Sequence, residues 1–357
     1  EKLTIARQLE ALGVDIIEAG FPISSPEDFK AVKLVADTLT EPSVCALARG
    51  LDLDIETAAR AVEGAAKPRI HTFISVSDIH IEYQMRKTRE EVLVMVERAV
   101  RKAKSYCDDV EFSPMDASRA DLDYMIKFTQ VAIDAGATTI NFPDTVGYAV
   151  PEEWGAWMRR IVEAIPAFKD KVVMSMHTHN DLGLATANAI AGVVNGARQI
   201  ECTLNGVGER AGNCSLEEVV MILNMRYKDR FRTNINTPEI IKTSRMISET
   251  MRIPVQPNKA IVGANAFAHS SGIHQDGIIK HRENFEIMDP KSVGADGSAI
   301  VLTARSGRHA LLYKLRSLGH EVNKEDVDDL YHRFLELADR EKHVTDEALI
   351  DLITTVP

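Results

Sequence analysis

Short apolar segments alternate with amphipathic stretches over the first 228 residues of the chain. Each apolar segment has the length of a strand and precedes a stretch with the 3.6-residue period of a surface helix. The strand candidates fall within residues 11–20, 43–49, 69–75, 109–113, 134–144, 171–177 and 195–206. Strict alternation of strands and helices predicts parallel β/α units and favours a (β/α)8 TIM barrel. An open doubly wound sheet is the alternative, although no glycine-rich fingerprint follows any strand.

The strand candidates number seven, one fewer than a closed eight-stranded barrel needs. The chain opens directly in a helical pattern, KLTIARQLEALG, so we predict that the first strand of the barrel is missing from this sequence. The alternation stops after about residue 228, and residues 229–267 combine a helix at 237–251 with an irregular linker. We therefore expect a catalytic barrel over residues 1–228. Residues 268–357 are expected to form a small, mostly helical C-terminal subdomain.

Composition narrows the class of protein. The chain has 357 residues, is 45% hydrophobic, and carries a net charge of -11 from 53 acidic and 42 basic side chains. Such a charge repels phosphate backbones and anionic membranes, so neither nucleic acid nor a membrane is an expected partner. No apolar run approaches the roughly 18 residues of a membrane span, and the first residues lack a signal-peptide pattern. A cytoplasmic protein is predicted, with four free cysteines because no CxxC pair occurs.

Candidate functional residues follow the strand candidates, because active sites of (β/α)8 enzymes lie at the C-terminal ends of the strands. In MSMHTHNDLG, His177 and His179 end a strand candidate, and residues two apart in a strand point to the same side. Two neutral imidazoles in one place match a divalent cation whose other ligands are oxygens. A hydrogen-bonded pair of rim histidines is the alternative. Asn180 or Asp181 is expected to cap the helix that follows.

Two polar segments add further candidates. NGVGERAGN (205–213) follows an apolar strand without the spacing of a phosphate-binding loop, and its Asn213 is positioned to offer an amide oxygen to a metal. A plain surface turn is the alternative. HSSGIHQDGIIKHREN (269–284) concentrates histidines, including His274, and a solvated helix face is the alternative there.

Together, the segments HTHNDLGLATAN, GVGERAGN, INFPDTVGY, IEAGFP and SGIHQDGIIK resemble the 2-isopropylmalate synthase family, metal-dependent acyl-CoA condensing enzymes built on a (β/α)8 barrel. The resemblance covers nearly the whole chain, and SGIHQDG with HRENFEIMDP favours this branch over homocitrate synthase. It implies condensation of acetyl-CoA with 3-methyl-2-oxobutanoate and thioester hydrolysis in leucine biosynthesis. Sibling enzymes that make citramalate, homocitrate or methylthioalkylmalate remain alternatives, as does a catalytically inactive relative.

The resemblance also implies roles for single residues. A divalent Mn, Mg or Zn ion would be held by His177, His179 and Asn213. The 2-oxo acid would be bound by Glu18, His71, Ser113 and Thr145. Near the thioester of acetyl-CoA, His274 would act as an acid or base from a C-terminal region that reaches the partner's barrel in a homodimer.

Two departures from the family pattern affect the expected activity. The family's first strand ends in an Arg-Asp pair that supplies a metal ligand and an oxyanion-stabilising group, and that strand is the one missing here. Many relatives carry a glutamate where this chain has Met115, in FSPMDASR, so the proton acceptor is expected to be water, His274 or a carboxylate such as Asp116. The leucine-binding regulatory domain of many members is not expected in this chain, and neither is feedback inhibition.

Overall fold

The computed structural model describes residues 1–341 and 344–354. The chain divides into two compact units. The barrel unit comprises residues 1–236 and 242–253, and the C-terminal unit comprises residues 237–241 and those from 254 onward. The stretch 229–267, predicted to be a helix and a linker, is therefore shared between the two units.

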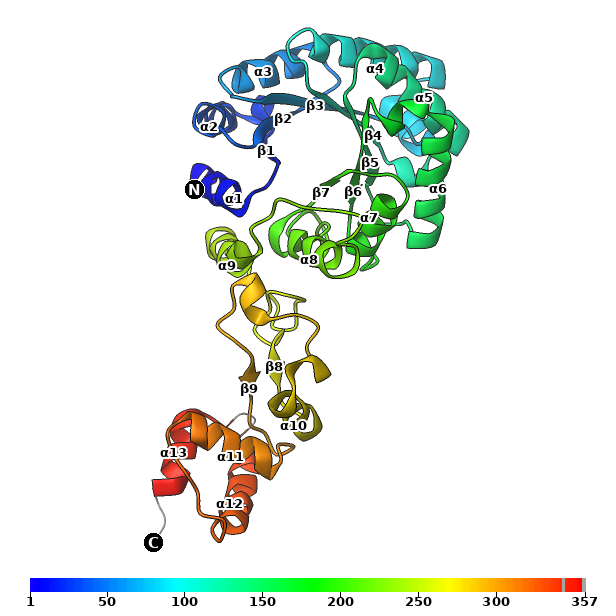
Figure 1. Cartoon of the computed structure of the whole chain (residues 1–357). Coiled ribbons are helices and arrows are strands. Elements are labelled where there is room, and N and C mark those ends of the chain that lie inside the picture. Colours follow the sequence, from blue (N-terminus) through cyan, green and yellow to red (C-terminus); the bar gives the residue numbers. More distant parts are fainter. Residues whose placement is uncertain (342–343, 355–357) are drawn as a thin grey trace. The chain divides into compact units, whose positions relative to one another are not determined.

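Along the described residues, seven parallel strands form one sheet in which the strands pair in chain order. The strands are β1 (Ile16–Gly20), β2 (Ser43–Arg49), β3 (Pro68–Ser75), β4 (Val110–Met115), β5 (Thr139–Asp144), β6 (Val173–Thr178) and β7 (Gln199–Glu201). The sheet curls round on itself with helices on its outer side (Figure 1). This order confirms the predicted barrel-type fold with seven strands, and it rules out a doubly wound sheet, in which the strand order reverses partway across.

The helices of the barrel unit cover the outer side of the sheet. They are α1 (Lys2–Leu12), α2 (Pro26–Ala36), α3 (Asp52–Val62), α4 (Arg89–Lys104), α5 (Leu122–Ala135), α6 (Pro151–Ala164), α7 (Ala185–Val194) and α8 (Leu216–Arg226). Helix α9 (Ile240–Met251) belongs to this unit from residue 242 onward. Local sequence sets where several of them begin. Ser25 accepts a hydrogen bond from the backbone of Asp28 at the start of α2, and Thr88 and Glu91 form a reciprocal capping box at α4. Within the described residues, no helix is long and apolar enough to cross a lipid bilayer.

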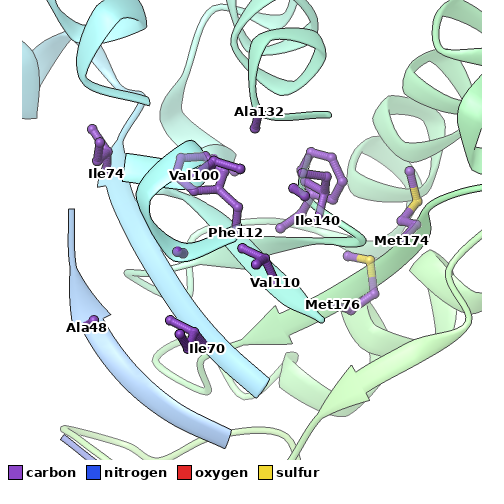
Figure 2. Packing of buried hydrophobic residues seen from close by; sticks show 14 of the residues in the cluster. Ala48, Ile70, Ile74, Val100, Val110, Phe112, Ala132, Ile140, Met174 and Met176 are labelled. Carbon is purple, nitrogen blue, oxygen red and sulfur yellow. The ribbon is translucent and has the colours of Figure 1, made fainter. Parts of the chain in front are cut away.

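The hydrophobic core of the barrel unit lies between the sheet and its helices. Phe112, Ile140, Met174 and Met176 from three neighbouring strands belong to this core (Figure 2). Helix α7 approaches the sheet closely because residue 192 is glycine, and a Cβ there would lie 2.5 Å from the Met176 side chain. Each large apolar side chain buried in this layer contributes about 1.5–3 kcal/mol to folding. Packing of these side chains fixes which face of each strand is left for polar residues.

Strand β6 illustrates that division. Met174 and Met176 pack in the core, whereas Ser175 accepts a hydrogen bond from Gln199 on the inner side of the sheet. His177 continues the inward series, as the two-residue period of a strand predicted.

The predicted cap of the helix after β6 was wrong. Helix α7 begins only at Ala185, with Leu184 as its N-cap residue and no side-chain cap. The carboxamide of Asn180 still accepts a 3.3 Å hydrogen bond from the Ala185 N–H across the intervening turn. Asp181 instead pairs with the guanidinium of Arg210. The tight turn before α7 displaces the helix start by several residues from the position that the sequence pattern indicated.

The C-terminal unit is mostly helical, as predicted. It contains a two-stranded ribbon of β8 (Ala268–His269) and β9 (Ala299–Ile300), with α10 (Gly272–Lys280), α11 (Arg308–Ser317), α12 (Val327–Arg340) and α13 (Asp346–Thr354). Its separate core includes Leu311, Leu315, Phe334 and Leu349. Helix α9 packs with the barrel unit instead, because Gln8 on α1 donates a 3.0 Å hydrogen bond to Thr243.

Candidate active site

The end of β6 brings two imidazoles together. Nε2 of His177 lies 3.0 Å from Nε2 of His179, and Nδ1 of His177 lies 2.6 Å from a carboxylate oxygen of Glu201 on β7. Neutral imidazole nitrogens are common ligands of divalent metals, and these two nitrogens lie side by side. The separation of the two Nε2 atoms therefore suits a shared divalent cation.

Asn213 lies directly beside this pair. It forms an isolated antiparallel bridge with His179, and the N–H of Cys214 donates a 3.0 Å hydrogen bond to the carbonyl of Thr178. Within the described residues, the amide oxygen of Asn213 is buried and accepts no hydrogen bond. An unpartnered amide oxygen next to two imidazoles fits the donor set of a divalent metal.

The pKa values of the two histidines are shifted in opposite directions. Burial alone would lower the pKa of His177, but its hydrogen bond and charge attraction with Glu201 outweigh burial and raise it. Burial, the charge of His177 and the charge of Arg210 lower the pKa of His179 to about 4. A hydrogen bond between the two Nε2 atoms requires that one of them carry a proton. A cation bound between the two rings would replace that proton.

A third imidazole lies on β3, inside the barrel. Nδ1 of His71 donates to Glu18 at 2.6 Å, and Nε2 of His71 lies 2.7 Å from the hydroxyl of Ser113. Asn141 donates a further hydrogen bond to the same hydroxyl at 2.9 Å. Burial lowers the pKa of His71, but the carboxylates of Glu18 and Glu201 outweigh it and raise the pKa to about 10. The structure thus joins three of the predicted substrate-binding residues, Glu18, His71 and Ser113, in one hydrogen-bonded chain that carries an imidazolium.

A layer of buried polar residues beneath these histidines was not found from the sequence. Arg69 donates to Glu111 at 2.9 Å and to Gln199 at 2.8 Å, and Gln199 donates to Glu111 at 2.7 Å. Arg69 and Glu111 each precede a recognised site residue, His71 or Ser113, by two positions on the same strand. That spacing is the signal that would have placed them on the inner face.

Two groups of three side chains come close enough to hold a metal among the described residues. One group is Glu18, Cys45 and His71, and the other is His71, Glu111 and Glu201. Both ring nitrogens of His71 are already engaged, with Glu18 and with Ser113. Burial raises the pKa of Cys45 well above its usual value, so its sulfur stays a thiol and a poor ligand. These groups are ion-pair and hydrogen-bond networks, and the pair of His177 and His179 remains the better metal candidate.

Asp116 and Thr145 meet at the ends of β4 and β5. The N–H of Asp116 donates a 2.9 Å hydrogen bond to the hydroxyl of Thr145. The buried carboxylate of Asp116 accepts hydrogen bonds from Ser77 and from the guanidinium of Arg119. With a left-handed backbone (φ 66°), Asp116 holds a sharp turn together.

Met115, which cannot accept a proton, and His274, which can, differ in their surroundings. Met115 ends β4 and is partly exposed. His274 belongs to α10 in the C-terminal unit, where its exposed ring stacks on Phe285 with the ring centroids 4.2 Å apart. No hydrogen bond to its ring nitrogens occurs within residues 1–341 and 344–354. The structure therefore brings all the predicted site residues except His274 into the barrel unit.

One arginine ties the loops around the histidine pair together. Arg210, in a left-handed conformation (φ 53°), donates two hydrogen bonds to Asp181 and one to the backbone carbonyl of Thr145. The three loops that carry Thr145, Asp181 and Arg210 follow β5, β6 and β7. Arg210 thereby stabilises the rim that also holds Asn213.

A curled parallel sheet with polar groups at its strand ends defines the class as a (β/α)-barrel enzyme of the HMGL-like family, whose family model matches residues 1–247. Residues 261–342 match the family described as homocitrate synthase post-HMGL domain-like.

Curated relatives give a finer assignment. The chain is 55% identical to the 2-isopropylmalate synthase of Carboxydothermus hydrogenoformans over 98% of this chain and 69% of that protein. It is 54% identical to the 2-isopropylmalate synthase of Thermosynechococcus vestitus, over 97% of this chain and 67% of the relative. The chain belongs to the 2-isopropylmalate synthase family, which confirms the predicted function and the predicted class of acyl-condensing enzyme.

Solved structures support the fold. Hydroxymethylglutaryl-CoA lyase from Pseudomonas aeruginosa aligns with a TM-score of 0.59 and 18% identity, over 71% of this chain and 86% of that chain. HMG-CoA lyase from Brucella melitensis aligns with a TM-score of 0.55 and 18% identity, over 71% of this chain and 90% of that chain. At this level of identity the likeness concerns the barrel fold alone.

Proposed function

We propose that this chain condenses acetyl-CoA with 3-methyl-2-oxobutanoate and hydrolyses the resulting thioester, which supplies 2-isopropylmalate for leucine biosynthesis in the cytoplasm. The observation that carries the proposal is the 3.0 Å approach of the two Nε2 atoms of His177 and His179 beside the unpartnered amide oxygen of Asn213. Four free cysteines, three of them buried, agree with a reducing compartment.

His177, His179 and Asn213 would hold the divalent ion. Two imidazoles with an amide oxygen suit Mn²⁺, Zn²⁺ or Mg²⁺, and the oxygen donor favours the harder ions. When bound, such an ion polarises the keto group of a 2-oxo acid and stabilises negative charge on its oxygen.

The carboxylate of the oxo acid would lie against the chain of Glu18, His71 and Ser113. His71 carries a positive charge there, because its pKa is raised to about 10. The hydroxyl of Ser113 accepts hydrogen bonds from His71 and Asn141, which leaves its own hydrogen to donate to a substrate oxygen. Thr145 accepts from the Asp116 N–H and likewise keeps its hydroxyl hydrogen. These residues therefore supply an imidazolium and two hydroxyl donors, which match an anionic oxo acid.

Proton transfer would fall to His274. Its exposed ring has both nitrogens free for a substrate among the described residues and is held by Phe285. Asp116 was the other residue that the sequence suggested as proton acceptor. Its carboxylate is occupied by hydrogen bonds from Ser77 and Arg119, which favours a role in holding the turn after β4. Met115 has no group that accepts a proton.

The protein would act as a homodimer in which His274 reaches the partner's barrel. Helix α10 exposes Ile273, and the segment after it exposes Ile287, with 79% and 78% of each residue accessible, and such apolar exposure suits a protein contact. Co-expression of His274→Ala and His177→Ala chains tests this arrangement. Random pairing of swapped dimers restores about a quarter of the sites, whereas sites built within one chain stay inactive.

The proposed reaction is tested by thiol release from acetyl-CoA with the full-length gene product and a panel of 2-oxo acids. We expect turnover that is fastest with 3-methyl-2-oxobutanoate, lost with EDTA and restored by Mn²⁺ or Mg²⁺. Faster turnover with pyruvate, 2-oxoglutarate or a methylthio-oxo acid would assign the chain to a sibling reaction. If no acid leads to thiol release, the protein is an inactive relative, and we would attribute the loss of activity to Met115.

A further inference from the structure

We infer that Glu201, at the end of β7, is a positioning residue that orients His177 for metal binding and links the metal site to the oxo-acid site. The inference rests on the proposed function, because it takes His177 and His179 as metal ligands. The resemblance to the family assigned no role to Glu201.

The parallel register between β6 and β7 creates the contact. His177 and Glu201 are direct Cα partners, so their side chains project from the same side of the sheet. Oε2 of Glu201 lies 2.6 Å from Nδ1 of His177. A carboxylate accepts hydrogen bonds and does not donate them, so Nδ1 must carry the hydrogen. The lone pair available for a metal is then on Nε2, the atom that faces His179 at 3.0 Å.

With a divalent ion at Nε2 of His177, this arrangement would be a carboxylate–imidazole–metal triad. Partners of that kind fix the tautomer and the ring orientation of a metal-binding histidine and make its nitrogen more basic. Without Glu201, Nδ1 of His177 would lose its acceptor in a position where the side chain is only 26% exposed. The imidazole would then be free to rotate or to change tautomer, and either change removes a ligand from the ion.

The second oxygen of Glu201 faces the other histidine. Oε1 lies 3.6 Å from Nδ1 of His71, whose ring hydrogen-bonds Glu18. One carboxylate therefore lies between the metal-site imidazole and the substrate-site imidazole. Glu111 also neighbours Glu201, but its direct ion pair is with Arg69 at 2.9 Å. Of these two inward carboxylates, Glu201 is the one that hydrogen-bonds to a proposed metal ligand.

Mn²⁺ binding, followed by calorimetry and by the EPR signal of free Mn²⁺, tests the inference without relying on turnover. Glu201→Gln keeps the size of the side chain and removes its charge. We expect its dissociation constant for Mn²⁺ to rise by about 10–100-fold. Glu201→Asp keeps the charge but withdraws the carboxylate, and we expect an intermediate constant. The matched control is Asp54→Asn, which removes a buried carboxylate on α3 that pairs with Arg49 at the end of β2 and contacts none of the proposed metal ligands. This control is expected to lower the melting temperature and leave the Mn²⁺ constant unchanged.

His177→Ala separates the two possible failures. Mn²⁺ binding that survives His177→Ala would overturn the proposed metal site itself, and the inference with it. Binding that His177→Ala abolishes, but that Glu201→Gln leaves within twofold of wild type, would overturn the inference and keep the proposed function. If Glu201→Gln does not fold, Glu201→Asp decides, because unchanged Mn²⁺ binding in that variant contradicts a positioning role.

Discussion

Replacement of Arg69 by methionine should destabilise the barrel unit through the buried carboxylate that it leaves behind. Arg69 and Glu111 are 9% and 2% exposed in their side chains and lie 2.9 Å apart. Removing one partner of such a buried pair typically costs about 3–5 kcal/mol, because the other charge stays buried without compensation. Asp109, the second acidic partner of Arg69, is 32% exposed and is expected to add little, because water can replace its contact.

Urea unfolding followed by tryptophan fluorescence measures this cost. Both tryptophans of the chain, Trp154 and Trp157, lie on α6, so their emission reports on the barrel unit. The matched control is the double variant Arg69→Met with Glu111→Met, which removes both charges and keeps apolar volume. We expect the double variant to recover most of the stability that the single variant loses.

The cost should also depend on pH. Burial and the neighbouring Glu201 raise the pKa of Glu111, and loss of Arg69 raises it further. The pKa of a glutamate in the unfolded chain is about 4.3. When the pKa is higher in the folded state, the protein becomes less stable as the pH rises above that unfolded value, because the folded state must then bury a charge. The destabilisation by Arg69→Met should therefore be larger at pH 8 than at pH 5. A cost below about 1 kcal/mol at pH 8, or a double variant no more stable than the single one, would refute this account of the buried pair.

Three further predictions concern the rim and the core. Gly212→Ala should weaken Mn²⁺ binding, because residue 212 has φ 94° and a new Cβ would collide with the backbone oxygen of Gly206. The control is Gly183→Ala, where φ is 74° but a Cβ would meet open space. This control should lower the free energy of unfolding by about 1–2 kcal/mol without affecting Mn²⁺ binding. Arg210→Met should raise the KM for the oxo acid while changing stability by less than about 1 kcal/mol, and a large fall in melting temperature with unchanged KM would contradict it. Phe112→Ala should cost about 3–5 kcal/mol in urea unfolding with no change in Mn²⁺ affinity, because the ring is fully buried on the helix side of β4.

The fold was predictable because hydrophobic periodicity is a local property. Strands at 43–49 and 139–144 stand out as apolar segments between amphipathic stretches, and they form where the pattern indicated. The start of α7 was not predictable, because the turn after His179 depends on where Arg210 holds Asp181. Arg210 belongs to a loop 29 positions further along the chain.

The candidate site divides in the same way. Strand geometry alone placed His177 and His179 on one side, and the strand ends supplied Glu18, His71 and Ser113. The pairing of the imidazoles with their carboxylates was not predictable. His71 and Glu18 are 53 positions apart, and His177 and Glu201 are 24 apart. A sequence pattern cannot supply the register between two parallel strands that makes these contacts.

The sequence by itself determined which residues are strands and helices, which faces are apolar, and which polar groups reach the strand ends. These properties follow from periods of 2 and 3.6 residues that are built into the backbone. Only the tertiary structure decided the partners: Glu201 for His177, Arg69 for Glu111, and the loops of Asp181 and Thr145 for Arg210. The curl of the sheet and the register of its strands bring those groups within hydrogen-bonding distance. Burial and neighbouring charges then set the pKa values on which the proposed chemistry depends.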